Sequence, residues 1–315
     1  MAQPDIIVTA PLPPFLYDPL KADYRCHDYY QASHKPGLLA AEGARIRGLV
    51  QGGGTVTPPS LLDELPSLEI ISVFGVGYDG VPVDYCKKRG IKVTNTPDVL
   101  TDDVADVAVG LIMMTGRGFV RLNRFVHAGG WARKGPELTT KLSGKRVGIL
   151  GLGRIGKAIA SRVEALGMKV SYTGRTRQDV PYQYFADLAS LAADSDFLVV
   201  ASPGGASTRN MVNADVLKAL GKKGTVINIA RGSIIDEDAL VTALRDGTIK
   251  AAGLDVFANE PNVPEALMSM DNVVLLPHVG SATHETRKAM GDLCKANLDA
   301  WFATGKVVTL IPELA

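Results

Sequence analysis

Short apolar runs alternate along the chain with longer amphipathic segments. This alternation is typical of parallel β-strands joined by crossover helices. In the first third, the expected strands are 5–10, 46–51, 68–75 and 91–96. Further along, the expected strands are 146–150, 168–173, 195–200, 225–230, 251–256 and 272–277, each of which could be buried on both faces. The pattern predicts an α/β protein built from doubly wound parallel sheets.

The predicted helices suggest how the chain divides. They are 83–90, 101–117, 154–166, 236–246 and 283–305. Segment 101–117 begins with acidic residues, which suit a helix N-terminus, and it is long enough to connect two domains. Segment 283–305 could carry the chain back to the first domain. We therefore expect a discontinuous domain of residues 1–97 and 286–315, a second domain of 98–285, and a cleft between them.

Composition narrows the class of protein. The 34 basic and 33 acidic residues leave a formal net charge of +1, which argues against a general nucleic-acid or anionic-membrane binder. No apolar run reaches the roughly 18–20 residues that span a bilayer, and the first residues do not resemble a secretory signal. Cys26, Cys86 and Cys294 show no metal-ligand spacing and are expected to be reduced thiols. We expect a cytoplasmic protein without a metal site.

The segment VGILGLGRIG (147–156) has the glycine spacing of a dinucleotide-binding turn. Gly151 permits the tight turn, Gly153 lets the backbone approach a pyrophosphate, and Gly156 lets helix and strand pack closely. A predicted strand precedes the turn, and the first amides of the helix that follows would face the phosphates. A turn that binds nothing is the alternative. The regular flanks favour a Rossmann-like dinucleotide-binding domain.

The end of the next strand bears on which dinucleotide is bound. NAD sites place an acidic residue about 20 positions after the motif, on the ribose 2′-hydroxyl. Here that region reads GRTRQ, with Gly174 where a carboxylate would stand. Arg175 and Arg177 can pair with a 2′-phosphate, and Thr176 can donate to it. The sequence favours NADP(H), with NAD(H) still open; a surface loop without a ligand is the alternative.

Three further segments place chemically useful residues near the ends of predicted strands. Arg231 in NIARG can clamp a carboxylate in bidentate fashion. His278 in LPHVGSATH can protonate a ketone oxygen as hydride reaches the carbon. A glutamate such as Glu260, in GLDVFANEP, would stabilise the protonated ring and fix its orientation. Taken singly, each has a structural alternative: a helix cap, a packed strand-end histidine or a solvated loop acid.

Together these motifs resemble a known family. TPDVLTDDVADVAVGLI (96–112), VGILGLGRIG, NIARG, GLDVFANEP and LPHVGSATHETR span nearly the whole chain in the family's order. The chain resembles the D-isomer-specific 2-hydroxyacid dehydrogenases, most of all the glyoxylate/hydroxypyruvate reductase branch. The resemblance implies an NADPH-dependent reductase that converts glyoxylate to glycolate and hydroxypyruvate to D-glycerate.

The resemblance also implies roles for individual residues. Arg231 would bind the substrate carboxylate and carbonyl, and His278 would be the acid/base with Glu260 as its partner. The family's substrate loop matches FGVGYDG (74–80), where amides around Val76 and Gly77 would hold the carboxylate. The flanking glycines would also permit a backbone anion nest. The first domain would therefore bind substrate.

Further residues match positions on the cofactor side. Asp255 matches the residue that faces the nicotinamide. The others implied to contact the cofactor are Thr101, Arg154, Ile155, Pro203, Thr208, Ala230 and Ser281. The chain departs from the family at SPGGAST (202–208), where many relatives read PLTPET. Pro203 and Thr208 are expected to keep their contacts, while the path of this loop stays open.

The segment HAGGWARKGPELTTKLSGK (127–145) matches the family's dimerisation arm, which places the arm at about 118–144 and implies a homodimer. Trp131 either reaches toward the partner's active site or is an ordinary core or surface residue. His27, His34, His127 and His284 lack a comparable setting and are expected to be structural or exposed.

The sequence leaves two alternative functions open. The first is a reductase of larger 2-oxo acids, aromatic or sugar-derived, because the glycine-rich segment QGGGT (51–55) offers little bulk. The other belongs to a different class, because the family includes corepressors that sense the dinucleotide and keep the catalytic trio. Those relatives carry extra tails, whereas this chain ends shortly after its last predicted helix, which disfavours a pure sensor.

Overall fold

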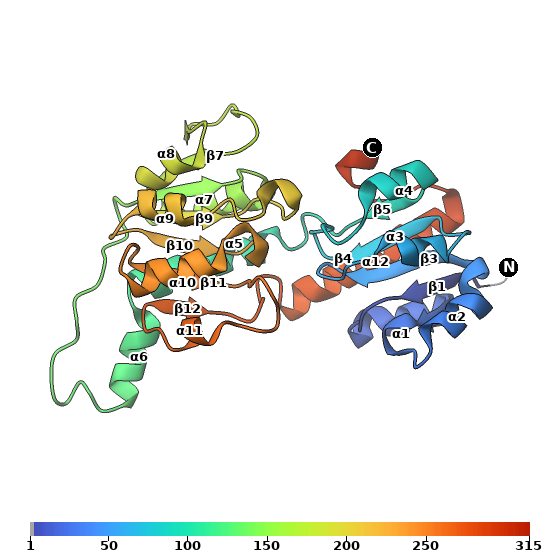
Figure 1. Cartoon of the computed structure of the whole chain (residues 1–315), viewed down its shortest axis with the longest axis horizontal. Helices are drawn as coiled ribbons and strands as arrows, with labels where there is room; N and C mark the ends of the chain where they lie inside the picture. The colour runs from blue at the N-terminus through green and yellow to red at the C-terminus, as the bar shows by residue number, and fades with distance from the viewer. Residues whose placement is uncertain (1–2) are drawn as a thin grey trace. The chain divides into compact units, whose positions relative to one another are not determined.

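A computed structural model describes residues 3–315 of the chain. It divides into two compact units, the first running to Leu100 and resuming over Thr283–Ala315, the second being Thr101–Ala282. Each unit is a parallel β-sheet with helices on both faces (Figure 1). The expected α/β class with two doubly wound parallel sheets is confirmed.

The first unit contains a five-stranded parallel sheet in the order β2-β1-β3-β4-β5. Its strands are β1 (Asp5–Val8), β2 (Arg25–Asp28), β3 (Ile46–Gly52), β4 (Ile70–Phe74) and β5 (Lys92–Thr94). The chain adds β2 on one side of β1 and the later strands on the other. The strand order therefore reverses between β1 and β3, where open parallel sheets leave a crevice at the strand ends.

Helices cover both faces of this sheet. They are α1 (Pro14–Asp23), α2 (Lys35–Glu42), α3 (Pro59–Asp63), α4 (Val83–Arg89) and α12 (His284–Thr304), with short 3₁₀ turns η1 (Tyr29–Gln31), η2 (Gly43–Arg45) and η5 (Pro312–Leu314). The hydroxyl of Ser72 on β4 donates to the Cys294 carbonyl on α12, 2.8 Å away. Gly48 on β3 leaves room for α12, because a Cβ there would lie 3.4 Å from Leu298. The last long helix thus completes the first unit's core.

The second unit contains a seven-stranded parallel sheet in the order β12-β11-β10-β9-β6-β7-β8. Its strands are β6 (Arg146–Leu150), β7 (Lys169–Thr173), β8 (Gln183–Tyr184), β9 (Phe197–Val200), β10 (Thr225–Asn228), β11 (Ala251–Leu254) and β12 (Val273–Leu275). Here the order reverses between β6 and β9. The segments that follow these two strands therefore flank the crevice of this sheet.

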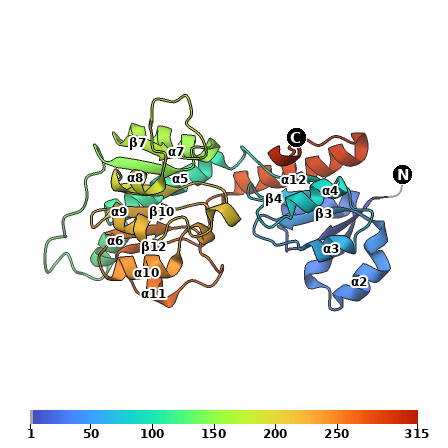
Figure 2. The ribbon, with the colours of Figure 1, turned by 45° about the horizontal axis from the view of Figure 1, so that its top comes forward.

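The helices of the second unit are α5 (Thr101–Gly116), α6 (Phe119–His127), α7 (Arg154–Ala165), α8 (Leu188–Ala193), α9 (Ala214–Leu220), α10 (Glu237–Arg245) and α11 (Glu265–Met268), with 3₁₀ turns η3 (Ala206–Thr208) and η4 (Gly232–Ile234). α5 and α7 pack together on one face, and α8, α9 and α10 pack on the other (Figure 2). α5 approaches β11 closely, since a Cβ at Gly253 would lie 3.1 Å from Leu111.

Several predicted strands end earlier than the apolar pattern indicated. The pattern predicts a strand over 225–230, but β10 ends at Asn228. The Asn228 side chain explains the early end, because its Oδ1 accepts the Ala230 amide at 3.1 Å and its Nδ2 donates to the Arg231 carbonyl at 2.9 Å. These local bonds turn the chain out of the sheet. The pattern gave no bounds for the short strands β2 and β8 or for the helices α1, α2, α3, α6, α8, α9 and α11.

α6 and the extended segment that follows it project from the second unit (Figure 1). They expose large apolar side chains that a folded core would normally bury. Phe119 is 42% exposed, Val126 53%, Trp131 66% and Leu138 98%. Trp131 therefore does not lie in the core of its own chain.

All three cysteines are free thiols. Cys86 and Cys294 are buried, and burial raises the pKa of the Cys86 thiol to about 11. These buried thiols are therefore protonated and unreactive near neutral pH. Across residues 3–315, no helix combines the length and the apolar character that crossing a membrane requires.

Candidate functional site

The glycine-rich turn lies between β6 and α7, at the point where the strand order of the second sheet reverses. Gly151 has a φ of +98°, and a Cβ there would meet the backbone of Ser202 at 2.8 Å. A Cβ at Gly156 would lie 2.3 Å from the Gly151 carbonyl oxygen. At Gly153 an added Cβ would face open space, with no described atom within 4 Å. The turn is therefore tight on its inner side and open at Gly153, as a pyrophosphate cradle requires.

The arginine-bearing loop follows β7. Arg175, Thr176 and Arg177 are all exposed, and the space beside Gly174 is clear of described atoms for 4 Å. The Gly151 amide donates to the Thr173 carbonyl at 2.9 Å, so this strand end lies against the glycine-rich turn. The structure thus places the two segments predicted to read the dinucleotide beside each other.

The sequence left open the path of the loop after β9. Hydrogen bonds from Thr208 to carbonyl groups earlier in the same loop fix that path. The Thr208 hydroxyl donates to the Pro203 carbonyl at 2.9 Å and lies 3.2 Å from that of Gly205. The hydroxyl of Ser202 is buried without a hydrogen-bond partner among the described atoms. The backbone of this serine is the segment that a Cβ at Gly151 would meet. Cofactor contacts at Pro203 and Thr208 remain predictions.

A buried carboxylate fixes the backbone that carries His278. His278 has a φ of +53°, a left-handed conformation that non-glycine residues rarely adopt. Asp255, directly after β11, is 1% exposed. Its Oδ1 accepts the Val279 amide at 2.7 Å and its Oδ2 accepts the Gly280 amide at 2.8 Å. Burial raises the pKa of Asp255, and these two amides act against that rise. The predicted cofactor residue thus also positions the histidine.

Glu260 and His278 form a direct pair. The Nδ1 atom of His278 lies 2.7 Å from Glu260 Oε2, and Glu260 Oε1 accepts the Phe257 amide at 3.1 Å. Burial of Glu260 acts to raise its pKa, but the hydrogen bond and charge of His278, the Phe257 amide and the charge of Arg231 together lower it. Glu260 is therefore ionised through the neutral range and presents a charged oxygen to the His278 ring.

Two residues that sequence reasoning missed hold the loop of Glu260. A Cβ at Gly232 would lie 1.8 Å from the Phe257 carbonyl carbon, so only glycine permits this approach. The Glu237 carboxylate, at the start of α10, accepts the Ala258 amide at 3.1 Å. The glycine at the end of NIARG, Gly232, could have indicated that another backbone segment approaches closely there. Through these contacts, the segments carrying Arg231 and Glu260 lie against each other.

The remaining predicted residues occupy both units. Thr101 begins α5, and Ala230 precedes Arg231, whose Nη1 reaches the Ala230 carbonyl at 2.8 Å. Arg154 and Ile155 open α7, and Ser281 follows the segment clamped by Asp255. In the first unit, Val76 and Gly77 follow β4. The Asn95 side chain donates to the Val76 carbonyl at 2.8 Å, which fixes the path of this loop.

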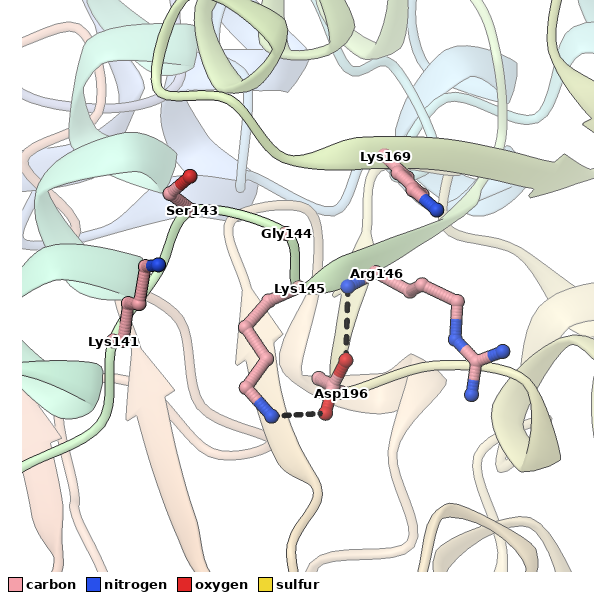
Figure 3. Close-up of a pocket in the computed structure, with 7 residues that line it drawn as sticks. All are labelled: Lys141, Ser143, Gly144, Lys145, Arg146, Lys169 and Asp196. Atoms are coloured by element: carbon pink, nitrogen blue, oxygen red, sulfur yellow. Dashed lines mark hydrogen bonds and ion pairs between the residues drawn. The ribbon is translucent and has the colours of Figure 1, made fainter.

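A hollow of about 440 Å³ lies at the opposite end of the second sheet, where the strands begin (Figure 3). It is lined by Lys141, Ser143, Gly144, Lys145, Arg146, Lys169 and Asp196. Asp196 accepts from Lys145 Nζ at 3.0 Å and from the Arg146 amide at 2.9 Å. Burial acts to raise the pKa of Asp196, but these donors lower it. The hollow lacks the paired acid and base found at the strand ends.

One cluster of the first unit has the residue types of a metal site. Asp5, His27 and Glu42 place ligand atoms within 4.8 Å of one another. His27 Nε2 already contacts Asp5 Oδ1 at 2.7 Å, and Glu42 pairs with Arg45. Each of the three side chains therefore already has a partner within the chain, and the structural role of His27 stays a prediction.

The site of the second unit thus combines a tight glycine-rich turn, the contact between Glu260 and His278, and Arg231 near Glu260. The model of the "D-isomer specific 2-hydroxyacid dehydrogenase, NAD binding domain" family matches residues 109–280. Glyoxylate/hydroxypyruvate reductase A of Arabidopsis thaliana is 45% identical over 305 residues, covering 96% of this chain and 97% of that protein. Hydroxyphenylpyruvate reductase of Plectranthus scutellarioides has the same identity and coverage.

Solved structures agree with these relatives. An NADPH-dependent glyoxylate/hydroxypyruvate reductase of Sinorhizobium meliloti, in complex with NADP and malonate, matches with a TM-score of 0.91 and 47% identity. The match covers 99% of this chain and 98% of that one. The chain therefore belongs to the family of D-isomer-specific 2-hydroxyacid dehydrogenases, which are NAD(P)-dependent oxidoreductases.

Proposed function

We propose that this dehydrogenase is an NADPH-dependent reductase of small 2-oxo acids, with glyoxylate and hydroxypyruvate as substrates and glycolate and D-glycerate as products. The observation that carries the proposal is the 2.7 Å contact between His278 and an ionised Glu260, at the same strand ends as the glycine turn. The printed names of the Arabidopsis and Sinorhizobium relatives support the choice of substrates.

The chain's own residues supply the proton and the charge complementarity that ketone reduction needs. Bound NADPH would supply the hydride. Because Glu260 engages Nδ1 of His278, the other ring nitrogen, Nε2, is the atom that donates a proton to the carbonyl oxygen. Arg231 pairs with the substrate carboxylate in bidentate fashion and stabilises the charge that develops on the oxygen. One hydride and one proton convert the ketone to the 2-hydroxy acid.

The preference for NADPH rests on the loop after β7. Gly174 stands where NAD sites carry an acid, so no carboxylate there repels a 2′-phosphate. The exposed Arg175 and Arg177 can pair with that dianion, and Thr176 can donate to it. Gly151, Gly153 and Gly156 would hold the pyrophosphate. The NADP named in the Sinorhizobium structure supports this choice.

A second candidate function is the reduction of larger 2-oxo acids. The relative from Plectranthus is named for hydroxyphenylpyruvate, an aromatic substrate. The turn after β3 contains Gly53, which approaches the Gly77 carbonyl, and Gly54, around which a Cβ would find no described atom within 4 Å. This turn adjoins the predicted substrate loop, and its glycines take little space. It therefore leaves room for a substrate with a larger group next to its 2-oxo acid.

The proposal also covers the roles of the two units and the partner, and the family membership supports both. The first unit would bind the substrate carboxylate through the amides of Val76 and Gly77, and the second would bind the dinucleotide. The segment 118–144 would form the arm of a homodimer, with its exposed apolar side chains covered by the second copy.

The first test measures the wild-type reaction. We expect the kcat/KM for glyoxylate and hydroxypyruvate to be at least about tenfold higher with NADPH than with NADH, because the arginines bind the 2′-phosphate. The rate at which the absorbance of the reduced cofactor falls gives kcat/KM for each pair of substrate and cofactor. Phenylpyruvate is included in the comparison as a larger 2-oxo acid. Faster turnover with NADH would contradict the cofactor preference alone. Phenylpyruvate as the fastest substrate would favour the second candidate function.

The second prediction concerns the proton donor. His278→Ala should lower kcat by about 10²–10⁴-fold, because no group then protonates the oxygen. Its dissociation constant for NADP⁺, measured by calorimetric titration, should stay within about twofold of the wild type. The matched control is His284→Ala, which removes an exposed histidine from the first turn of α12 and should leave kcat unchanged. Near-normal turnover of His278→Ala would rule out the assigned role.

The third prediction concerns the carboxylate that faces His278. Glu260→Gln keeps the size of the side chain but removes the charge from the oxygen that His278 Nδ1 contacts at 2.7 Å. The kcat/KM for hydroxypyruvate should therefore fall at least about tenfold, because the charged partner that orients the ring is lost. Initial rates measure the fall, and Glu265→Gln, at an exposed position on the short helix α11, is the control. An unchanged kcat/KM would show that Glu260 does not act on the histidine.

The fourth prediction concerns the arm. Light scattering after size-exclusion chromatography should give the wild-type chain the mass of a dimer. Leu138→Asp combined with Val126→Asp should shift the population toward monomer, because charges replace apolar side chains that are 98% and 53% exposed in one chain. Lys134→Asp changes an exposed charge on the same segment and should keep the dimer. A monomeric wild type, or an unaffected double variant, would contradict the assigned interface.

A further inference from the structure

The loop that follows β7 is tied at its far end by Gln178. The Gln178 amide donates to the Tyr172 hydroxyl at 2.7 Å, and that hydroxyl lies 3.3 Å from the Gln178 carbonyl oxygen. The side-chain Nε2 of Gln178 donates to the Leu152 carbonyl at 2.9 Å. Leu152 lies between the first two glycines of the cradle. Gln178 therefore joins the arginine loop directly to the glycine-rich turn.

The near end of the loop is held by a pair of tyrosines. Tyr172 on β7 is fully buried, and its ring centroid lies 5.3 Å from that of Tyr184 on the neighbouring strand β8. The Tyr184 hydroxyl lies 3.4 Å from the Gly174 carbonyl oxygen. The three residues between these anchors, Arg175, Thr176 and Arg177, are exposed. A short exposed segment is thus fixed at both ends.

The chemistry of NADP(H) explains why the hydrogen bond between Gln178 and Leu152 would matter for binding. On the adenosine ribose, the 5′ carbon leads to the pyrophosphate and the 2′ carbon carries the extra phosphate. Two anionic groups therefore depart from one rigid sugar and must be met by two protein segments at a fixed separation. Long exposed arginine side chains lose rotamer freedom when they bind, so their backbone must already be in place.

We propose that Gln178 is a positioning residue for cofactor selectivity: by bonding to Leu152, it sets the separation between the arginine loop and the pyrophosphate cradle. The inference rests on the proposed NADPH preference and adds to it a residue outside the set that touches the 2′-phosphate. Gln178 acts through Arg175 and Arg177, so it matters for NADP(H) and much less for NAD(H).

The test is the binding of the oxidised cofactors to the full chain, measured by calorimetric titration without turnover. Gln178→Ala should reduce the ratio of NADP⁺ to NAD⁺ affinity about five- to tenfold, mainly by weakening NADP⁺, as expected for the loss of one positioning hydrogen bond. The kcat at saturating NADPH should stay within about twofold. Gln183→Ala, an exposed glutamine on β8, is the matched control and should keep the wild-type ratio.

The outcomes separate this inference from the proposed function. A wild-type chain that binds NAD⁺ as tightly as NADP⁺ refutes the cofactor preference, and the inference falls with it. A wild-type preference for NADP⁺ that Gln178→Ala leaves unchanged, or an equal loss for both cofactors, overturns the inference alone. If Gln178→Ala does not fold, as judged by circular dichroism, Gln178→Met replaces it, since it keeps the length of the side chain but removes the Nε2 donor to the Leu152 carbonyl. An unchanged ratio there also overturns the inference.

Discussion

The candidate site depends on the buried carboxylate of Asp255. It lies at the end of β11 and accepts both amides that follow His278, at 2.7 and 2.8 Å. A left-handed conformation at a residue such as histidine costs about 1–3 kcal/mol. Hydrogen bonds to a charged group contribute about 1.5–3 kcal/mol each, so the two together offset that strain. The clamp therefore keeps His278 in a conformation that its own sequence would not select, with its ring beside Glu260.

The position of Glu260 has the same kind of origin. Its loop is held by Gly232, whose missing Cβ lets two backbone segments touch, and by Glu237, which accepts the Ala258 amide. With the backbone fixed, one oxygen of Glu260 bonds within its own loop and the other meets His278. The proposed acid and its partner are therefore aligned before any substrate arrives, which lowers the reorganisation that a proton transfer requires.

Sequence could predict the parts of this arrangement that depend on local pattern. The glycine turn was predictable because its spacing, its preceding strand and its following helix are all short-range features. The closeness of Arg231, Glu260 and His278 was predictable because these residues follow strands of one predicted parallel sheet, whose ends must share an edge. The short helices α3 and α8 were missed because segments of five and six residues carry too little periodicity to be recognised.

Other features could not be predicted because they arise only when distant segments meet. Nothing local to Asp255 shows that its oxygens accept amides about 25 residues later, and no pattern around His278 predicts its positive φ. Asn228 read as part of an apolar strand, although its side chain ends β10 by bonding to the next turn. Gln178 looked like one more polar residue of a surface loop.

The two ends of the second sheet differ in how well they could hold an anion, which supports the proposed position of the dinucleotide. At the strand starts, lysine side chains surround Asp196, but flexible cations in water hold an anion weakly. At the strand ends, the donors are backbone amides at the beginning of α7, fixed by a turn that only glycine at 151 can make. Fixed donors lose little entropy on binding, and the helix dipole adds to their attraction for an anion. A rigid cradle also fixes the distance from the bound pyrophosphate to a neighbouring loop. The position of the loop anchored by Gln178 can therefore decide which dinucleotide fits.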